Sequence, residues 1–170
     1  MAATYEPIAT TTLGTANNTV TFSSIASSWT DLVIILVSRT TAVGSGGQNM
    51  FIRLNGDTST IYSNTSLTGN GSTTSSARNT NNNGCEIPTA LATSSGIWSL
   101  NKIDIFSYAG STFKTLLTES SRDENGSGTT RRVVSLYRST TAVSSVSLVA
   151  DGGDTFAVGT IATLYGIKAA

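Results

Sequence analysis

The apolar residues of this chain occur in short stretches that alternate with polar residues and do not follow a helical period. Val20 and Phe22 are separated by one polar residue, and so are Ile103 and Ile105. Alternation with a period of two is typical of a β-strand that buries one face. Residues 31–40 form a nearly continuous apolar run, which predicts the most buried strand. No segment shows sustained helical periodicity or a persuasive capping box.

Turn sequences such as Asn55-Gly56-Asp57 separate these stretches at fairly regular spacing. This pattern predicts an all-β, antiparallel β-sandwich of jelly-roll-like type with about eight to ten strands. A length of 170 residues suits a single domain over 1–170. Segment 1–13 is predicted to be an arm or an edge strand, where the missing N–H of Pro7 is tolerated.

Residues 58–83 contain few apolar side chains and are predicted to form a long surface excursion with one short strand. Excursions of this size in a compact domain are usually functional or contact loops. We therefore expect binding there first.

The composition is polar but carries little charge. Ser and Thr make up roughly a third of the chain, whereas only 12% of the residues are charged. The 10 Lys and Arg balance the 10 Asp and Glu, so no basic field exists to attract nucleic acid, and no nucleic-acid role is expected. So little net charge is a mild indication of oligomerisation. We also expect no membrane span and no signal peptide, and therefore synthesis in a cytoplasm.

The absence of histidine excludes Ser-His-Asp and Cys-His catalysis and every histidine-ligated metal site. Cys85 is the only cysteine, so no disulfide framework or thiolate zinc site is possible. Asp104 and Glu119 lie in strands predicted to be adjacent, but Lys102 and Lys114 are near enough to pair with them. A carbohydrate-active enzyme that uses two carboxylates stays open as a third hypothesis, although the prediction is that the chain is not an enzyme.

Two turns rich in Asp and Gly, 123–126 and 151–154, could supply oxygen ligands to calcium. Neither has the alternating spacing of a recognised calcium loop, so ordinary hairpin turns explain them better. We predict no cofactor.

Arginines concentrate around one predicted hairpin, as Arg122, Arg131, Arg132 and Arg138. They form either a solvated strand face or a contact with an acidic neighbouring subunit or a surface glycan. Exposed aromatic residues could stack on sugars, although each is more often an anchor at the edge of the core; these are Trp29, Tyr62 and Trp98.

Several short motifs taken together resemble a family of small proteins from tailed phages, of the kind found in cyanophages. The motifs are Tyr5-Glu6-Pro7-Ile8 with Thr10 and Thr12, Asn55-Gly56-Asp57 before Tyr62-Ser63, Leu136-Tyr137-Arg138-Ser139-Thr140, and Thr163-Leu164-Tyr165-Gly166-Ile167. The resemblance covers nearly the whole chain. It implies a virion β-sandwich, either a capsid decoration (cement) protein or the terminal domain of a tail fibre, and it supplies no catalytic residues.

The first hypothesis is accordingly a decoration protein on the outer surface of the virion, made in the host bacterial cytoplasm. Its partners would be the major capsid protein and copies of itself, as a homotrimer. The alternative is a receptor-binding domain of a tail fibre or tailspike that recognises host surface glycan; the first predicted strand begins almost at once, which disfavours an independent fibre. The predicted partner contacts are Tyr5, Pro7, Ile8, Tyr62, Leu67, Arg78, Arg122, Arg131 and Arg132.

Overall fold

Twelve β-strands make up the regular structure of this protein, in a computed structural model that describes residues 5–42, 49–88 and 96–168. Every regular element in these ranges is a strand, which confirms the predicted all-β class, although the strands outnumber the predicted eight to ten. None of the described ranges holds a helix long and apolar enough to cross a membrane. The strands are β1 (Tyr5–Thr12), β2 (Thr19–Phe22), β3 (Asp31–Ser38), β4 (Asn49–Leu54), β5 (Tyr62–Gly69), β6 (Thr74–Asn82), β7 (Cys85–Pro88), β8 (Ser99–Phe106), β9 (Lys114–Asp123), β10 (Gly128–Tyr137), β11 (Val146–Ala150) and β12 (Ile161–Ile167).

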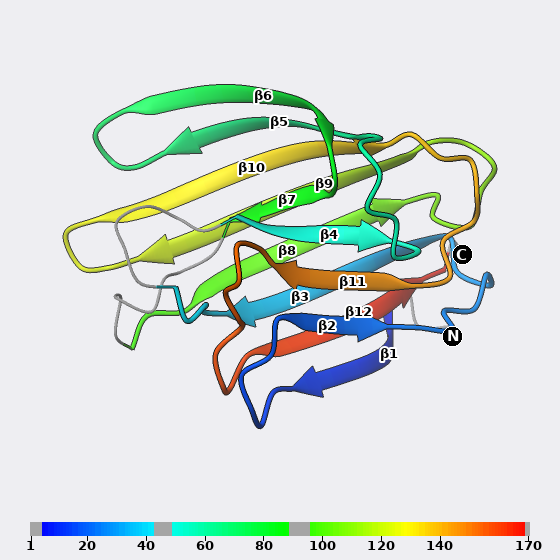
Figure 1. The fold of residues 1–170 in the computed structure, drawn as a ribbon, viewed down its shortest axis with the longest axis horizontal. Coiled ribbons are helices and arrows are strands. Elements are labelled where there is room, and N and C mark those ends of the chain that lie inside the picture. Colours follow the sequence, from blue (N-terminus) through cyan, green and yellow to red (C-terminus); the bar gives the residue numbers. More distant parts are fainter. Residues whose placement is uncertain (1–4, 43–48, 89–95, 169–170) are drawn as a thin grey trace.

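The strands form two antiparallel sheets that face each other as a sandwich (Figure 1). The large sheet has the order β1-β12-β3-β8-β9-β10-β5-β6, and the small sheet has the order β2-β11-β4-β7. Eight of these strands, in the orders β1-β12-β3-β8 and β2-β11-β4-β7, are arranged as in the two four-stranded sheets of a jelly roll. The predicted jelly-roll-like sandwich is confirmed. The predicted N-terminal edge strand is also confirmed as β1, while residues 1–4 lie outside the described residues.

Two hairpins extend the large sheet beyond the jelly roll. The hairpin β9–β10 follows β8, and the hairpin β5–β6, inserted between β4 and β7, pairs with β10. The prediction of one short strand in residues 58–83 is therefore wrong, because this segment contains two long strands. Its outer strand β6 is exposed along nearly its whole length. Thr, Ser and Asn occupy positions that no apolar layer faces, so the segment lacks the alternation by which sequence reveals a strand.

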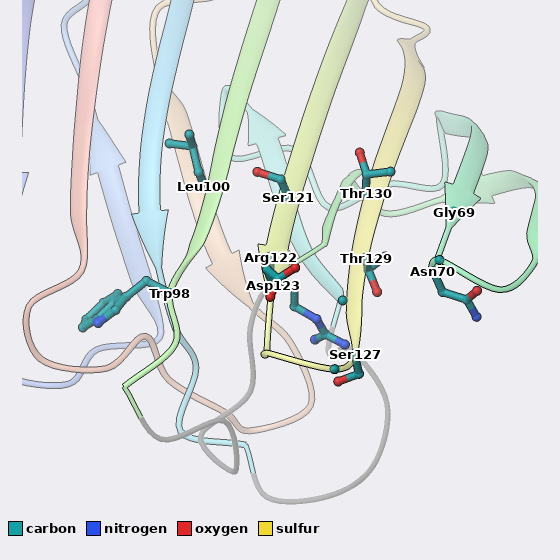
Figure 2. Close-up of a pocket in the computed structure, with 13 residues that line it drawn as sticks. Gly69, Asn70, Trp98, Leu100, Ser121, Arg122, Asp123, Ser127, Thr129 and Thr130 are labelled. Carbon is teal, nitrogen blue, oxygen red and sulfur yellow. The ribbon is translucent and has the colours of Figure 1, made fainter.

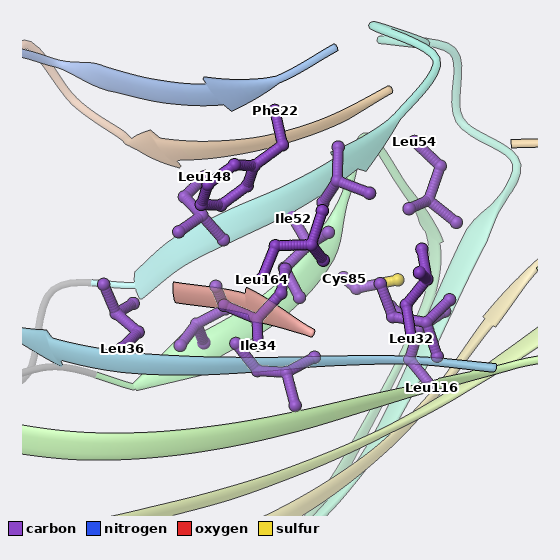
Figure 3. Close-up of a cluster of buried hydrophobic side chains, with 14 of the residues drawn as sticks. Phe22, Leu32, Ile34, Leu36, Ile52, Leu54, Cys85, Leu116, Leu148 and Leu164 are labelled. Carbon is purple, nitrogen blue, oxygen red and sulfur yellow. The ribbon is translucent and has the colours of Figure 1, made fainter. Parts of the chain in front are cut away.

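The core lies between the two sheets and follows from the alternation along each strand (Figure 3). Ile34 and Leu164 reach into it from adjacent strands of the large sheet, and Ile52 and Leu148 reach into it from the small sheet. Each of these side chains is fully buried. Burial of one such side chain contributes about 1.5–3 kcal/mol to folding.

Beneath the added hairpins the inner face of the large sheet becomes polar, and hydrogen bonds replace apolar packing. The buried Asn64 on β5 accepts hydrogen bonds from the Glu86 backbone N–H (3.1 Å) and the Ser135 hydroxyl (2.6 Å). Its amide donates to the Gly84 carbonyl (3.3 Å). These bonds tie β7 of the small sheet to β5 and β10, so the extension is joined to the sandwich by polar contacts.

A charged pair belongs to the same polar layer. Arg131 Nη2 lies 2.8 Å from Glu86 Oε2, and the two side chains are 16% and 4% exposed. Arg131 also donates to the Ser66 hydroxyl at 3.2 Å. The pair therefore forms a further bridge between β10 and β7.

Two tyrosines close the core where the extension meets the jelly roll. The rings of Tyr62 and Tyr137 are stacked with their centroids 4.7 Å apart. The Tyr62 hydroxyl accepts a hydrogen bond from the Leu54 N–H (3.1 Å) and donates to the Asp57 carbonyl (3.2 Å). Burial raises the pKa of the Tyr62 hydroxyl. The predicted exposure of Tyr62 as a contact residue is wrong, because pairing of β5 with β10 places it opposite Tyr137 in the core.

Lys114 at the start of β9 is fully buried, and it does not pair with a carboxylate as expected. Its ammonium donates to the carbonyl oxygens of Gly110 (2.8 Å) and Ser139 (3.5 Å). Desolvation lowers the pKa of Lys114. The side chain holds together the two connections that flank the β9–β10 hairpin.

Candidate contact surface and groove

The outer face of the large sheet, turned away from the small sheet, is apolar over β3 and β12. Alternation turns Val33, Ile35 and Val37 of β3 to this face, together with Ile161 and Tyr165 of β12. An antiparallel sheet with one solvated face normally carries polar residues there. No layer of the described chain covers this face (Figure 1). Over β3 the outer face therefore has the apolar composition of a surface that packs against another layer.

Six exposed large hydrophobic side chains lie on the same face, four of them on β1, β12 and β8 and two on β10 and β5. They are Tyr5, Leu67, Leu100, Phe106, Val134 and Ile161, each between 41% and 59% exposed. Contiguous apolar patches on a protein surface mark contact sites more often than scattered single residues do. We call the part of the outer face over β1, β12, β3 and β8 the apolar half.

Charges on the outer face are paired with one another. Lys102 lies 2.8 Å from Asp104 within β8, and Arg132 lies 2.6 Å from Glu119 across β10 and β9. The hydrogen bond to Asp104 raises the pKa of Lys102. The expected pairing of Asp104 with Lys102 is confirmed, whereas Glu119 uses Arg132. Each of the two carboxylates thus forms an ion pair with a Lys or Arg side chain, as expected of a structural role.

A groove lies at one end of the outer face, beside the tips of the two added hairpins (Figure 2). Its volume is about 650 Å³. One row of residues in register across four strands lines it, namely Leu100 on β8, Ser121 on β9, Thr130 on β10 and Gly69 on β5.

The groove exists because three of the four positions in this row, Ser121, Thr130 and Gly69, carry a short side chain or none. The next outward-facing row toward the middle of the sheet carries Lys102, Glu119, Arg132 and Leu67, all of which are long. The step from long to short side chains leaves a hollow across β9, β10 and β5.

Two turns complete the groove on the side of the hairpin tips. In the β5–β6 turn, Asn70 Oδ1 accepts hydrogen bonds from the N–H groups of Ser72 (3.0 Å) and Thr73 (2.7 Å). In the β9–β10 turn, Asp123 Oδ1 accepts a hydrogen bond from the Asn125 N–H (2.9 Å). Gly126 has a φ of 120°, a backbone conformation that residues with a side chain rarely adopt. Local hydrogen bonds and glycine thus fix both rims.

Trp98 lies at the β8 end of the groove, with its ring directed away from Ser121 (Figure 2). The guanidinium of Arg39 lies over the ring, 5.3 Å from its centroid. One ring face is therefore occupied. Trp29, also expected to be an exposed aromatic, instead packs partly against the core, next to Gly166.

The predicted contact residues divide between surface and interior. Tyr5 and Leu67 lie exposed on the outer face, and Pro7 and Arg78 lie exposed on the edge strands β1 and β6. Ile8 is half-buried and packs against the core, because it follows the outward-facing Pro7 and so points to the opposite face of β1. Tyr62 belongs to the core, as described above.

The predicted cluster of arginines is not one surface. Arg131 faces the interior and Arg132 faces outward, since successive residues of a strand point to opposite faces. Arg122 pairs with Glu124 at 3.2 Å beside the groove. Arg138 donates to the Thr60 carbonyl (3.0 Å) and to Asn81 Oδ1 (3.1 Å). Each guanidinium therefore has its own partner, and Arg131, predicted as a partner contact, is engaged with Glu86 between the sheets.

Cys85 is fully buried, and burial raises the pKa of its thiol to about 12. The reactive thiolate is therefore suppressed at neutral pH. Within the described ranges, no group of three or more Cys, Asp or Glu residues is placed to hold a metal ion.

Comparison of the chain with protein-family models, with curated proteins and with solved structures gives no match.

Proposed function

We propose that this protein is a structural component of a phage particle, a capsid decoration protein that docks through its apolar half. The observation that carries the proposal is the continuation of apolar side chains onto a face that no layer of the described chain covers. Burial of Val37, Phe106 and Ile161 against capsid subunits would stabilise the assembled state by mass action.

The size of the apolar half fits a contact that is repeated over a lattice. At strand spacings of about 4.8 Å and a rise of about 3.4 Å per residue, four strands of eight residues cover roughly 500 Å² in projection. A standard interface uses about 800 Å² on each partner, so one such contact is weak to moderate. Several copies joined as an oligomer, for which we propose a trimer, would bind with much higher avidity.

Copy number in purified particles tests the location. A decoration protein is expected in hundreds of copies per particle, whereas a tail component is expected in a few to a few dozen. Quantitative mass spectrometry against the major capsid protein gives this number. Absence of the chain from purified particles would refute both locations.

A pair of phenylalanines tests the docking surface. Phe106→Glu places a charge in the apolar half and should reduce binding of the purified protein to capsids that lack it by at least tenfold. Phe113→Glu is the matched control, because Phe113 has a similar exposure but lies in the β8–β9 connection, outside the sheet. Equal effects of the two substitutions, with both variants folded, would contradict docking through the apolar half.

The alternative role, a receptor-binding terminal domain of a tail fibre or tailspike, is favoured by one observation, the groove beside the hairpin tips.

A further inference from the structure

We infer that the groove bounded by Leu100, Ser121, Thr130 and Asp123 binds a short segment of an uncharged oligosaccharide. The site lies on the added hairpins and the adjoining end of β8. It goes beyond the docking role proposed above and does not depend on it, because a glycan could be bound from the head or from the tail of a particle.

The backbone of the groove floor argues against an extended peptide as the ligand. The floor crosses β8, β9, β10 and β5, and each of these strands is hydrogen-bonded to a strand on both sides. A bound peptide adds to a sheet through free backbone groups at an edge strand, and the floor contains no such edge. Recognition must therefore come from side chains.

The side chains of the groove combine an apolar end with hydroxyl groups. Leu100 is half exposed at the β8 end, and the exposed Ser121 and Thr130 follow it across the sheet. Asp123 contributes a carboxylate whose Oδ1 accepts the Asn125 N–H, and a carboxylate has further acceptor sites. A sugar ring presents both an apolar face and hydroxyl groups, so it matches this mixture.

Charge at the groove disfavours an acidic ligand. Arg122 is engaged by Glu124 at 3.2 Å, and Asp123 adds a negative charge to the rim. A phosphate or a uronic acid would meet no surplus of cations there. The ligand class is therefore a neutral saccharide.

The dimensions suit a short chain of sugars. The floor spans three strand spacings, or about 14 Å. The volume of about 650 Å³ falls within the range of roughly 300–1,000 Å³ that is usual for small-ligand sites. The saccharide would lie across the strands, from Leu100 toward Gly69.

The first experiment applies the full-length protein to a glycan array that contains neutral and acidic oligosaccharides. We expect binding to neutral glycans, and we expect titration calorimetry with the strongest of them to give a measurable affinity. No binding by the folded protein, or a preference for acidic glycans, would overturn the inference.

The second experiment places the binding in the groove. Ser121→Arg fills the hollow with an exposed side chain and should weaken binding at least tenfold. Thr115→Arg is the matched control, because Thr115 is exposed on the same face of β9 at the opposite end of the strand. Binding that survives Ser121→Arg, or that falls equally in both variants, would overturn the assignment.

The third experiment uses a local reporter. The chain has two tryptophans, so Trp29→Phe leaves Trp98 as the only one, beside the groove. Because the Trp98 ring is directed away from Ser121 (Figure 2), the readout is compared with and without Ser121→Arg in the same background. A saturable change in fluorescence that Ser121→Arg abolishes supports binding at the groove, and a change that persists in that variant counts against it. Copy number per particle is unaffected by any of these results, so failure here is distinct from failure of the decoration role.

Discussion

Replacement of Arg131 by Met should destabilise the fold far more than the same replacement at the neighbouring Arg132. Arg131 pairs with Glu86 in the interior, where the side chains are 16% and 4% exposed. Arg132 pairs with Glu119 on the outer face, where the side chains are 61% and 46% exposed. The two substitutions have the same chemistry and differ in the face of β10 that they change.

The expected magnitudes differ because of solvation. Removal of one partner from a buried ion pair leaves an uncompensated charge and typically costs about 3–5 kcal/mol. We expect about 3 kcal/mol for Arg131→Met, since part of this guanidinium reaches solvent. An exposed pair contributes about 0–1 kcal/mol, so Arg132→Met should cost less than about 1 kcal/mol.

Urea unfolding followed by circular dichroism measures both free energies. With a dependence of about 2 kcal/mol per molar urea, the midpoint should fall by about 1.5 M for Arg131→Met and by less than about 0.5 M for Arg132→Met. Adding Glu86→Gln to Arg131→Met should recover at least about 1 kcal/mol, because the unpaired charge is removed. Equal midpoints for the two single variants, or no recovery in the double variant, would refute this explanation of the polar layer.

Two further predictions concern buried positions. Gly166→Ala should destabilise the protein by about 2 kcal/mol or more in urea unfolding, because its Cβ would lie 2.1 Å from Cδ2 of Trp29. Adding Trp29→Ala should relieve part of this loss. An unchanged unfolding midpoint for Gly166→Ala would contradict the expected clash. The thiol of Cys85 has an ordinary pKa of 9.0 and a pKa of about 12 in the fold. The folded state thus keeps a proton that the unfolded state loses, and the stability that Cys85 contributes is present below pH 9 and is lost as the pH rises from 9 toward 12. Cys85→Ala should make the decline in unfolding free energy between pH 8 and 10.5 shallower than in the unsubstituted protein, and identical slopes would count against this assignment.

The sequence predicts the jelly roll better than its additions. In the jelly-roll strands, apolar residues alternate with polar neighbours because one face of each strand packs on the apolar core. The two-residue period in the sequence therefore predicts which side chains are buried, as it does for Val20, Phe22, Ile103 and Ile105. The β5–β6 hairpin faces a polar layer on one side and solvent on the other. Its two strands therefore carry no alternation of apolar residues. They form a hairpin of the large sheet because β5 pairs with β10.

Some features of the surface follow from the alternation along one strand, whereas others require the pairing between strands. The opposite orientations of Arg131 and Arg132 follow from the two-residue period alone, and so the expected arginine cluster could have been divided from sequence. The burial of Tyr62 and the groove at Ser121 could not, because each requires the register between strands that are distant in the chain. Within the apolar half, the continuous run 31–40 already indicated that β3 is apolar on both faces.

Both added hairpins are attached to the jelly roll at one end, where Leu54 is paired with Val146, and they carry their turns to the other end. The turns at 70–73 and 124–127 can therefore change in length or composition without altering the ladders of the eight jelly-roll strands. Related chains with the same core are free to present different rims to the groove. Changes confined to the tips would leave the apolar half of the outer face as it is.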